Sequence, residues 1–257
     1  MFANVHQQLH SRAAATLSSI EGRLDRIMQV WLLFAGLASV ARIATSPIKP
    51  GHADLATIAP YLLLIFAPFA SMVLALRWFS TGDSVPQPVV RVARIGHWKR
   101  VSQQSAQRHA VYGAGGMMVS LLIGMLLNIP VRAIEYFAAM PALAGPVPQW
   151  LGKLHTLMTL DVVLLTSLYA IAFVAALRRV PSFPRLLVAI WALDLAMQLV
   201  TAQIVARSPG LPANVATALQ PLLEGNIKKV LISIALWLPY LLLSKRVNVT
   251  YRHRIPA

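Results

Sequence analysis

Apolar positions fall into six long runs that are separated by shorter polar stretches. Each run approaches the roughly 20 residues that a helix needs to cross the hydrocarbon of a bilayer. A spanning segment must satisfy its own backbone hydrogen bonds, and no stretch alternates with the period of a strand, so helices are predicted. The predicted helices cover residues 27–44, 56–79, 111–134, 154–177, 186–206 and 227–244.

The residues before the first run predict a different kind of helix. Apolar side chains recur there at three- and four-residue steps, and three arginines lie off this stripe. Such a pattern is typical of a helix that lies in the membrane interface. We therefore divide the chain into an amphipathic interfacial segment, 1–26, and a six-helix transmembrane domain, 27–257.

Composition supports a membrane protein and excludes several functions. Hydrophobic residues make up 57% of the chain and charged residues 12%, whereas soluble domains carry roughly 25% charged residues. The net charge of +15 could indicate nucleic-acid binding. The basic residues instead form short blocks between apolar runs, and Trp98 is the lone aromatic in the main basic connection, so nucleic acid is not predicted. The absence of cysteine excludes disulfides, iron–sulfur clusters and cysteine-based zinc sites.

Basic residues also predict the orientation. The N-terminal segment, the connection after the second run, the turn between the fourth and fifth runs and the tail share one side and hold sixteen of the 23 Lys and Arg residues. By the positive-inside rule, both termini are predicted to be cytoplasmic. In the connection, "PVVRVARIGHWKRV" (88–101) is predicted to lie along the membrane surface like the N-terminal segment, where both would contact anionic lipid.

Two carboxylates are predicted to lie inside the membrane. Asp161 lies roughly 10 Å from the outer end of the fourth helix, and Asp194 roughly 12 Å from the cytoplasmic end of the fifth. Gln198 and Thr201 follow Asp194 at helical spacing, so these three are expected to face the bundle interior. A carboxylate at this depth must pair, protonate or face water.

The role of Asp194 has two interpretations. It could bind a proton or cation, as acidic residues do in transporters, or it could be a neutral or hydrogen-bonded structural group. No basic residue is expected at a comparable depth, which disfavours a salt bridge. For Asp161 a packing ion pair with Arg132, Lys228 or Lys229 is predicted.

Other candidate sites have weaker support. Glu135, His155, Asp161 and Glu224 are predicted on the outer side, but they lack the spacing of metal ligands, so no metal or cofactor is predicted. Small residues at Gly116, Ser120 and Gly124 predict close approach of another helix. Prolines inside the second and sixth runs, Pro68 and Pro239, predict kinks.

Two stretches carry a resemblance to a known family. The stretches are "WLPYLLLSKRVNVTY", near the C-terminus, and "RRVPSFPRLL", in the turn between the fourth and fifth helices. They resemble a bacterial inner-membrane family catalogued as domain of unknown function 2569. The matching residues are Phe183, Pro184, Arg185, Trp237, Pro239, Tyr240, Ser244, Lys245, Arg246, Val247, Thr250 and Tyr251.

The resemblance is expected to cover the first helix and residues of about 154 to 251. Family members resemble four-helix proteins, so the second and third helices would be an extra pair. The resemblance implies membership and a multi-pass location in the bacterial cytoplasmic membrane. It implies no activity.

Three functions remain open. The first is a non-enzymatic envelope component that binds a lipid, a membrane-protein partner or a second copy of the chain. The second is a small secondary transporter or channel that uses Asp194. The third, an intramembrane enzyme built on His155, Asp161 and Glu224, has the least support because no catalytic motif accompanies these residues.

Overall fold

The protein is an all-α bundle built on six long apolar helices. The computed structural model describes residues 2–47, 54–82, 85–88 and 96–257, without the side chains of residues 2–11. Within this part of the chain, six helices are long and apolar enough to cross a membrane, as predicted. They are α2 (Leu24–Thr45), α3 (Leu55–Trp78), α5 (Met117–Ala139), α6 (Gln149–Leu177), α7 (Phe183–Ala206) and α8 (Ala213–Leu243).

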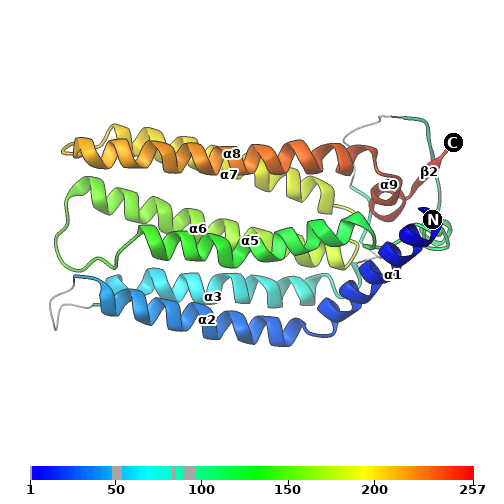
Figure 1. Cartoon of the computed structure of the whole chain (residues 1–257), viewed down its shortest axis with the longest axis horizontal. Helices are drawn as coiled ribbons and strands as arrows, with labels where there is room; N and C mark the ends of the chain where they lie inside the picture. The colour runs from blue at the N-terminus through cyan, green and yellow to red at the C-terminus, as the bar shows by residue number, and fades with distance from the viewer. Residues whose placement is uncertain (1, 48–53, 83–84, 89–95) are drawn as a thin grey trace.

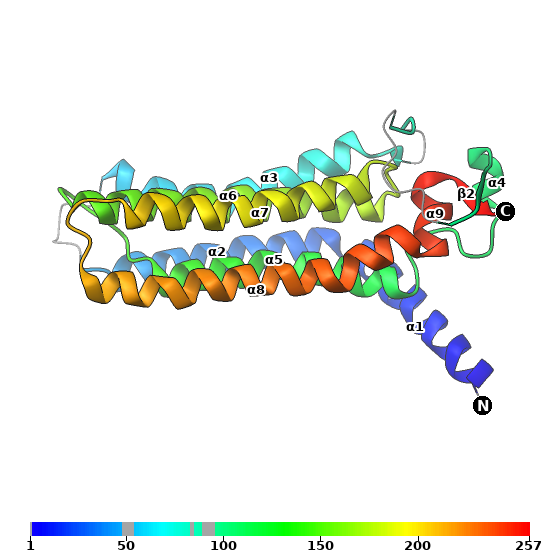
Figure 2. The same cartoon turned by 90° about the horizontal axis from the view of Figure 1, so that it is seen from above.

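The helices form two layers, with α3, α6 and α7 in one and α2, α5 and α8 in the other (Figure 2). Helix α6 lies at the centre and packs against α3, α5 and α7. Two clusters of buried apolar residues surround it, one of which extends to the end of the bundle that carries both chain termini. Helix α8 makes its principal helix–helix contacts with α7 and with the short helix that follows it. It is therefore a peripheral helix, although it is the longest.

Both termini lie at one end of the bundle, hereafter the terminal end (Figure 1). An even number of crossings requires this arrangement. The same end carries α1 (Phe2–Glu21), which extends away from the bundle in Figure 2. It also carries α4 (Gln103–Gln107), α9 (Lys245–Arg252) and two short strands, β1 (Trp98–Arg100) and β2 (Arg254–Pro256). The other end is called the opposite end.

Two short strands include part of a segment that the sequence pattern singled out. Residues 88–101 were predicted to lie along the membrane surface, and this stays a prediction; residues 89–95 lie outside the described residues, and Trp98–Arg100 form β1, which pairs antiparallel with β2. Lys99 lies opposite Ile255 in this register. The partner strand comes from the last residues of the chain. A local pattern in 88–101 could not reveal a pairing with a segment so far away in sequence.

Two helix starts differ most from the prediction. Helix α5 begins at Met117 rather than at 111, because Gly113 and Gly116 adopt φ of +104° and +63°, which is outside the helical region. Helix α8 begins at Ala213 rather than at 227. Residues 213–226 include Pro221 and Gly225, which are poor helix formers, and the stretch is too polar to be found by hydropathy. At about 1.5 Å per residue, α8 is about 46 Å long, longer than the roughly 30 Å of bilayer hydrocarbon.

The predictions for the prolines and for the small residues compare differently with the structure. Pro68 and Pro239 lie inside α3 and α8, as expected. In contrast, Ser120 and Gly124 are exposed on α5, and a Cβ added at Gly124 would meet no heavy atom within 4 Å. The expected close approach of another helix of this chain is therefore wrong among the described residues.

Candidate functional site

A buried arginine joins three helices in the half of the bundle away from the termini. One guanidinium nitrogen of Arg132 on α5 donates to Oδ2 of Asp161 on α6 at 3.1 Å. The other terminal nitrogen pairs with Asp194 on α7, whose exposed fraction is 0%. The arginine Nε donates to Asn128 Oδ1 at 3.0 Å, one helical turn away on α5. The guanidinium also lies 5.9 Å from the ring centroid of Tyr169, within the range of a cation–π contact.

Amide side chains extend this network to α8. Gln198 donates to the other oxygen of Asp161 at 3.1 Å, and Asn226 on α8 donates to the Gln198 carbonyl at 3.3 Å. The network therefore links α5, α6, α7 and α8 through side chains. Asp194 Oδ1, although buried, has no hydrogen-bond partner among the described residues. We call Arg132, Asp161, Asp194, Gln198 and Asn226 the polar network.

Helical spacing explains why α7 supplies its polar residues on one face. Asp194, Gln198 and Thr201 are four and three residues apart, and all three are buried. Their predicted orientation toward the bundle interior is confirmed. Lipid on the outer face offers polar groups no partner, so this face must turn inward.

The ion-pair prediction for Asp161 is confirmed and the ion-pair prediction for Asp194 is wrong. The predicted ion pair between Asp161 and Arg132 is confirmed. The expectation that Asp194 has no basic partner is wrong, because Arg132 contacts both carboxylates. Counting residues gives the depth of a Cα atom and omits the length of the arginine side chain, which here reaches into the bundle. Lys228 and Lys229, the other predicted partners of Asp161, pair instead with Glu224 and Glu135.

A cavity of about 600 Å³ reaches the polar network from the opposite end of the bundle. It lies between α5, α6 and α8, and Arg132, Asp161 and Asn226 all line it. At its wall, Lys229 on α8 pairs with Glu135 on α5. The charged side chains of Arg132 and Asp161 therefore border this cavity, whereas Asp194 does not line it.

The remaining acidic and imidazole candidates are separate from each other. His155 lies beside Tyr136, whose hydroxyl is 3.3 Å from Nε2 and 2.8 Å from the Thr159 hydroxyl. Glu224 pairs with Lys228 along α8 at 3.9 Å. Among the described residues, no group of three potential metal ligands is brought together.

The two family motifs meet at the terminal end of the bundle. The Phe183 ring, at the start of α7, lies 5.1 Å from that of Tyr251 on α9. The Tyr251 hydroxyl donates to the Ala176 carbonyl on α6 at 2.8 Å, and burial raises the pKa of Tyr251. Arg246 donates to the carbonyl of Gly113 at 3.4 Å, beside the start of α5. Helix α9 therefore covers the ends of α5, α6 and α7. The remaining motif residues lie at the same end: Pro184, Arg185, Trp237, Pro239, Tyr240, Ser244, Lys245, Val247 and Thr250.

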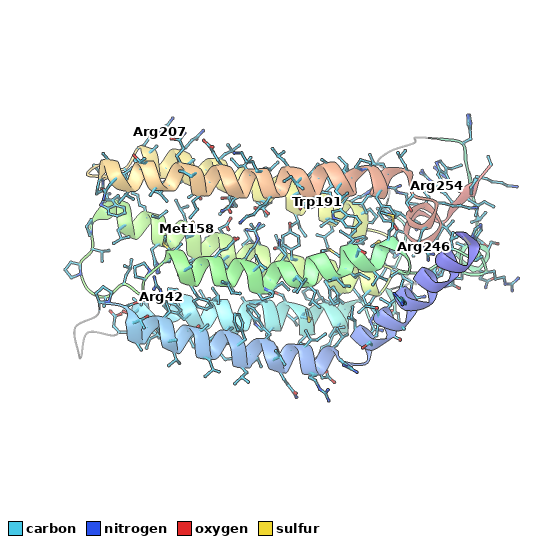
Figure 3. All side chains as sticks on the ribbon, in the orientation of Figure 1. Arg42, Met158, Trp191, Arg207, Arg246 and Arg254 are labelled. Carbon is cyan, nitrogen blue, oxygen red and sulfur yellow. The ribbon has the colours of Figure 1, made fainter. Side chains whose placement is uncertain are left out.

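A second cavity, of about 580 Å³, lies where these motifs meet. We call it the arginine groove. Arginines line it at the terminal end, where Figure 3 labels Arg254. Its described lining holds no carboxylate. The lining residues are Gln87, Pro88, Pro181, Pro184, Arg185, Val188, Ala189, Ala192, Leu238, Leu241, Leu242, Arg252 and Arg254.

The arginines of the groove have different surroundings. Arg254 is buried in β2, whereas Arg185, in the first turn of α7, is partly exposed. Arg252 donates to the Leu242 carbonyl at 3.4 Å and to Asn248 Oδ1 at 3.1 Å. Burial, together with the neighbouring Arg254 and Arg185, lowers the pKa of Arg252 to about 10. Arg252 therefore keeps its positive charge at neutral pH.

The long apolar helices and the polar residues between them define a multi-pass helical membrane protein. Residues 111–252 match the family described as "Protein of unknown function (DUF2569)". This match covers more than half of the chain, and the protein belongs to that family. Neither a curated protein nor a solved structure matches the chain.

The extent of the match corrects the expected coverage. It begins at residue 111 and ends at residue 252, and so contains α5, α6, α7, α8 and α9. The first helix, which was expected to belong to the resemblance, lies outside it. The additional pair therefore consists of the first and second membrane helices, α2 and α3. The expected pair was the second and third, α3 and α5. Both the polar network and most of the arginine groove lie within the matched region.

Proposed function

We propose that this protein is a non-enzymatic component of a bacterial cytoplasmic membrane that binds an anionic phospholipid in the arginine groove. The observation that carries the proposal is the form of this groove. Arg185, Arg252 and Arg254 line a cavity whose other walls are mainly apolar. Its volume lies within the range of small-molecule sites.

The groove suits a lipid better than a soluble anion. Val188, Ala189 and Ala192 are exposed on α7, on a face that bilayer hydrocarbon covers, and Leu238 and Leu242 face them from α8. An acyl chain can lie along this wall while a phosphate contacts the arginines, because guanidinium groups bind phosphate with paired hydrogen bonds. A free phosphate would leave the apolar wall unused.

The distribution of basic residues supports a cytoplasmic position for the groove. Sixteen of the 23 Lys and Arg residues belong to segments of the terminal end, which the positive-inside rule assigns to the cytoplasm. The cytoplasmic leaflet is also the one rich in anionic lipid. The proposed ligand and the proposed orientation are therefore consistent with each other.

Native mass spectrometry in mild detergent tests the proposal with phosphatidylglycerol and phosphatidylethanolamine of identical acyl chains. We expect retained phosphatidylglycerol, and Arg185→Ala should weaken its binding about fivefold, since one basic residue near a membrane surface contributes about 1 kcal/mol. Arg178→Ala is the matched control, because Arg178 is exposed in the adjoining turn and does not line the groove. Equal retention of both lipids, or equal effects of the two variants, would contradict the proposal.

A second candidate function, a small secondary transporter, is favoured by the buried carboxylate of Asp194 and the cavity beside it. Acidic residues at this depth are frequent in proton pathways. Proton-driven solute flux into liposomes is the measurement for this candidate. Flux that is unchanged by Asp194→Asn would remove it.

A further inference from the structure

The polar network carries an imbalance of charge. Arg132 contributes one positive charge and contacts two carboxylates, those of Asp161 and Asp194. If both carboxylates are ionised, the group has a net charge of −1. A net charge that is buried in a medium of low dielectric constant is strongly unfavourable, so it is neutralised by protonation or by a bound ion.

The surrounding side chains do not supply the missing positive charge. Lys229 on α8 pairs with Glu135 on α5, and this pair adds no net charge. Tyr169 on α6 approaches Arg132 through its ring. The amides of Gln198 and Asn226 are neutral hydrogen-bond donors. The charged and titratable side chains described near the two carboxylates are Arg132, Glu135, Tyr136, Tyr169 and Lys229.

The unpartnered oxygen of Asp194 identifies what completes the network. This Oδ1 atom is buried and accepts no hydrogen bond from the described residues, although an ionised carboxylate normally accepts several. Asp194 has an exposed fraction of 0% and lines none of the described cavities near the network. A metal ion would require space and several further oxygen ligands. A proton requires neither.

We propose that Asp161 and Asp194 together bind one proton, which they exchange with the opposite side of the membrane through the cavity between α5, α6 and α8. In this step a carboxylate oxygen gains the proton and the network becomes neutral. The two carboxylates share Arg132, so a single proton balances the charge of both. Asp161 lines the cavity and is the member that water reaches. This inference does not depend on lipid binding.

Infrared difference spectroscopy of the full-length protein in liposomes tests the proton site. The wild type should show the carbonyl band of one protonated carboxyl group at neutral pH, which disappears as the pH is raised. Asp194→Asn and Asp161→Asn should each abolish it, because the remaining carboxylate balances Arg132. Glu135→Gln, which removes a carboxylate at the cavity wall, is the matched control and should retain the band.

The outcomes separate the proposal from simple misfolding. Asn preserves the shape of Asp, and each variant is first required to match the wild type in helical circular dichroism and in elution volume. Absence of the neutral-pH band from the wild type overturns the proposal. Survival of the band in both single variants also overturns it, because the proton would then reside on another group.

A second substitution tests the route. Gly225 lines the cavity, and an added Cβ there would meet no heavy atom within 4 Å. Gly225→Leu should therefore slow the shift of the carboxyl band after transfer to D2O at least severalfold. Gly124→Leu is the control, since Gly124 is also open to a side chain but lies on an exposed face of α5. Equal exchange rates in the two variants would overturn access through this cavity.

Discussion

The α5–α6 pair has a different neighbour on each side, and the two interfaces differ in chemistry. Toward α2–α3 the contacts are apolar and aromatic: Ala35 and Leu64 are completely buried, and the Tyr61 ring stacks 6.3 Å from that of Phe137. Toward α7–α8, in the half away from the termini, the polar network joins the helices. Figure 1 shows both pairs against the same central pair.

This difference separates a fixed interface from one that can change state. Apolar packing depends on shape and is insensitive to pH or ligands. Ion pairs in a medium of low dielectric constant depend on protonation, because loss of one charge leaves its partner unbalanced. The α2–α3 pair lies outside the region that matches the family, and the network lies inside it. The ion pairs that protonation would alter therefore lie in the family region, and the additional pair extends the bundle by packing.

The largest expected effect comes from removing the shared cation. Arg132→Met leaves the buried Asp161 and Asp194 without their shared cation, and breaking a buried ion pair costs about 3–5 kcal/mol. Unfolding in mixed detergent micelles should show this loss at neutral pH and a smaller loss in acid, where protonation removes the negative charge that Arg132 had balanced. Arg42→Met is the control, because Arg42 donates to a neutral carbonyl, that of Met140, at 2.8 Å. Equal losses in the two variants would refute the proposed difference between the interfaces.

A cavity in the apolar interface should have the next largest effect. Leu64→Ala removes a fully buried side chain on α3, and large-to-small substitutions of this kind cost about 2–5 kcal/mol. Thermal unfolding should give the same loss at acidic and neutral pH. Leu62→Ala, at a position 41% exposed on the same helix, should change stability by less than about 0.5 kcal/mol. A strong pH dependence for Leu64→Ala would show that this interface is not purely apolar.

A single amide of the polar network should contribute less. Gln198→Leu removes the donor to Asp161 and the acceptor for Asn226. Side-chain hydrogen bonds between membrane helices contribute about 0.6 kcal/mol on average and about 1.7 at most. Gln203→Leu, on an exposed face of α7, provides the baseline in the same unfolding measurement. A loss much above 2 kcal/mol for Gln198→Leu would mean that the network acts as one unit rather than as separate bonds.

The smallest effect is expected at a tyrosine of the apolar interface. The Tyr61 hydroxyl is buried and has no partner among the described residues, so Tyr61→Phe should change stability by less than about 0.5 kcal/mol or increase it. Tyr136→Phe is the comparison, because it removes the hydrogen bond with Thr159 and should cost about 1 kcal/mol. If Tyr61→Phe costs as much as Tyr136→Phe, the Tyr61 hydroxyl has a partner in the membrane.

Hydropathy predicted where the chain crosses the membrane because it is a local property. Each of the six spans could be read from about 20 consecutive residues. The errors in the starts of α5 and α8 have local causes that hydropathy does not measure. Gly113 and Gly116 stop a helix inside an apolar run, and residues 213–226 form a helix although they are too polar for a span.

The candidate sites required more than the local pattern. Burial of Asp194, Gln198 and Thr201 on one face followed from their spacing, because the period of a helix determines which residues share a face. The spacing did not show which basic residue contacts Asp194. Arg132 comes from a different helix, and its long side chain spans the difference in depth. The arginine groove was also missed, although Arg185 and Arg252 both belong to basic blocks used for the orientation.

By itself the sequence determined the six helices, the position of both termini at one end of the bundle and the polar face of α7. These properties arise from interactions of neighbouring residues with a uniform solvent, water or lipid. Only the tertiary structure decided that one arginine serves two carboxylates, that β1 pairs with the chain end and that Arg185 and Arg252 line one cavity. Such contacts depend on which distant segments become neighbours, and hydropathy and spacing do not contain that information.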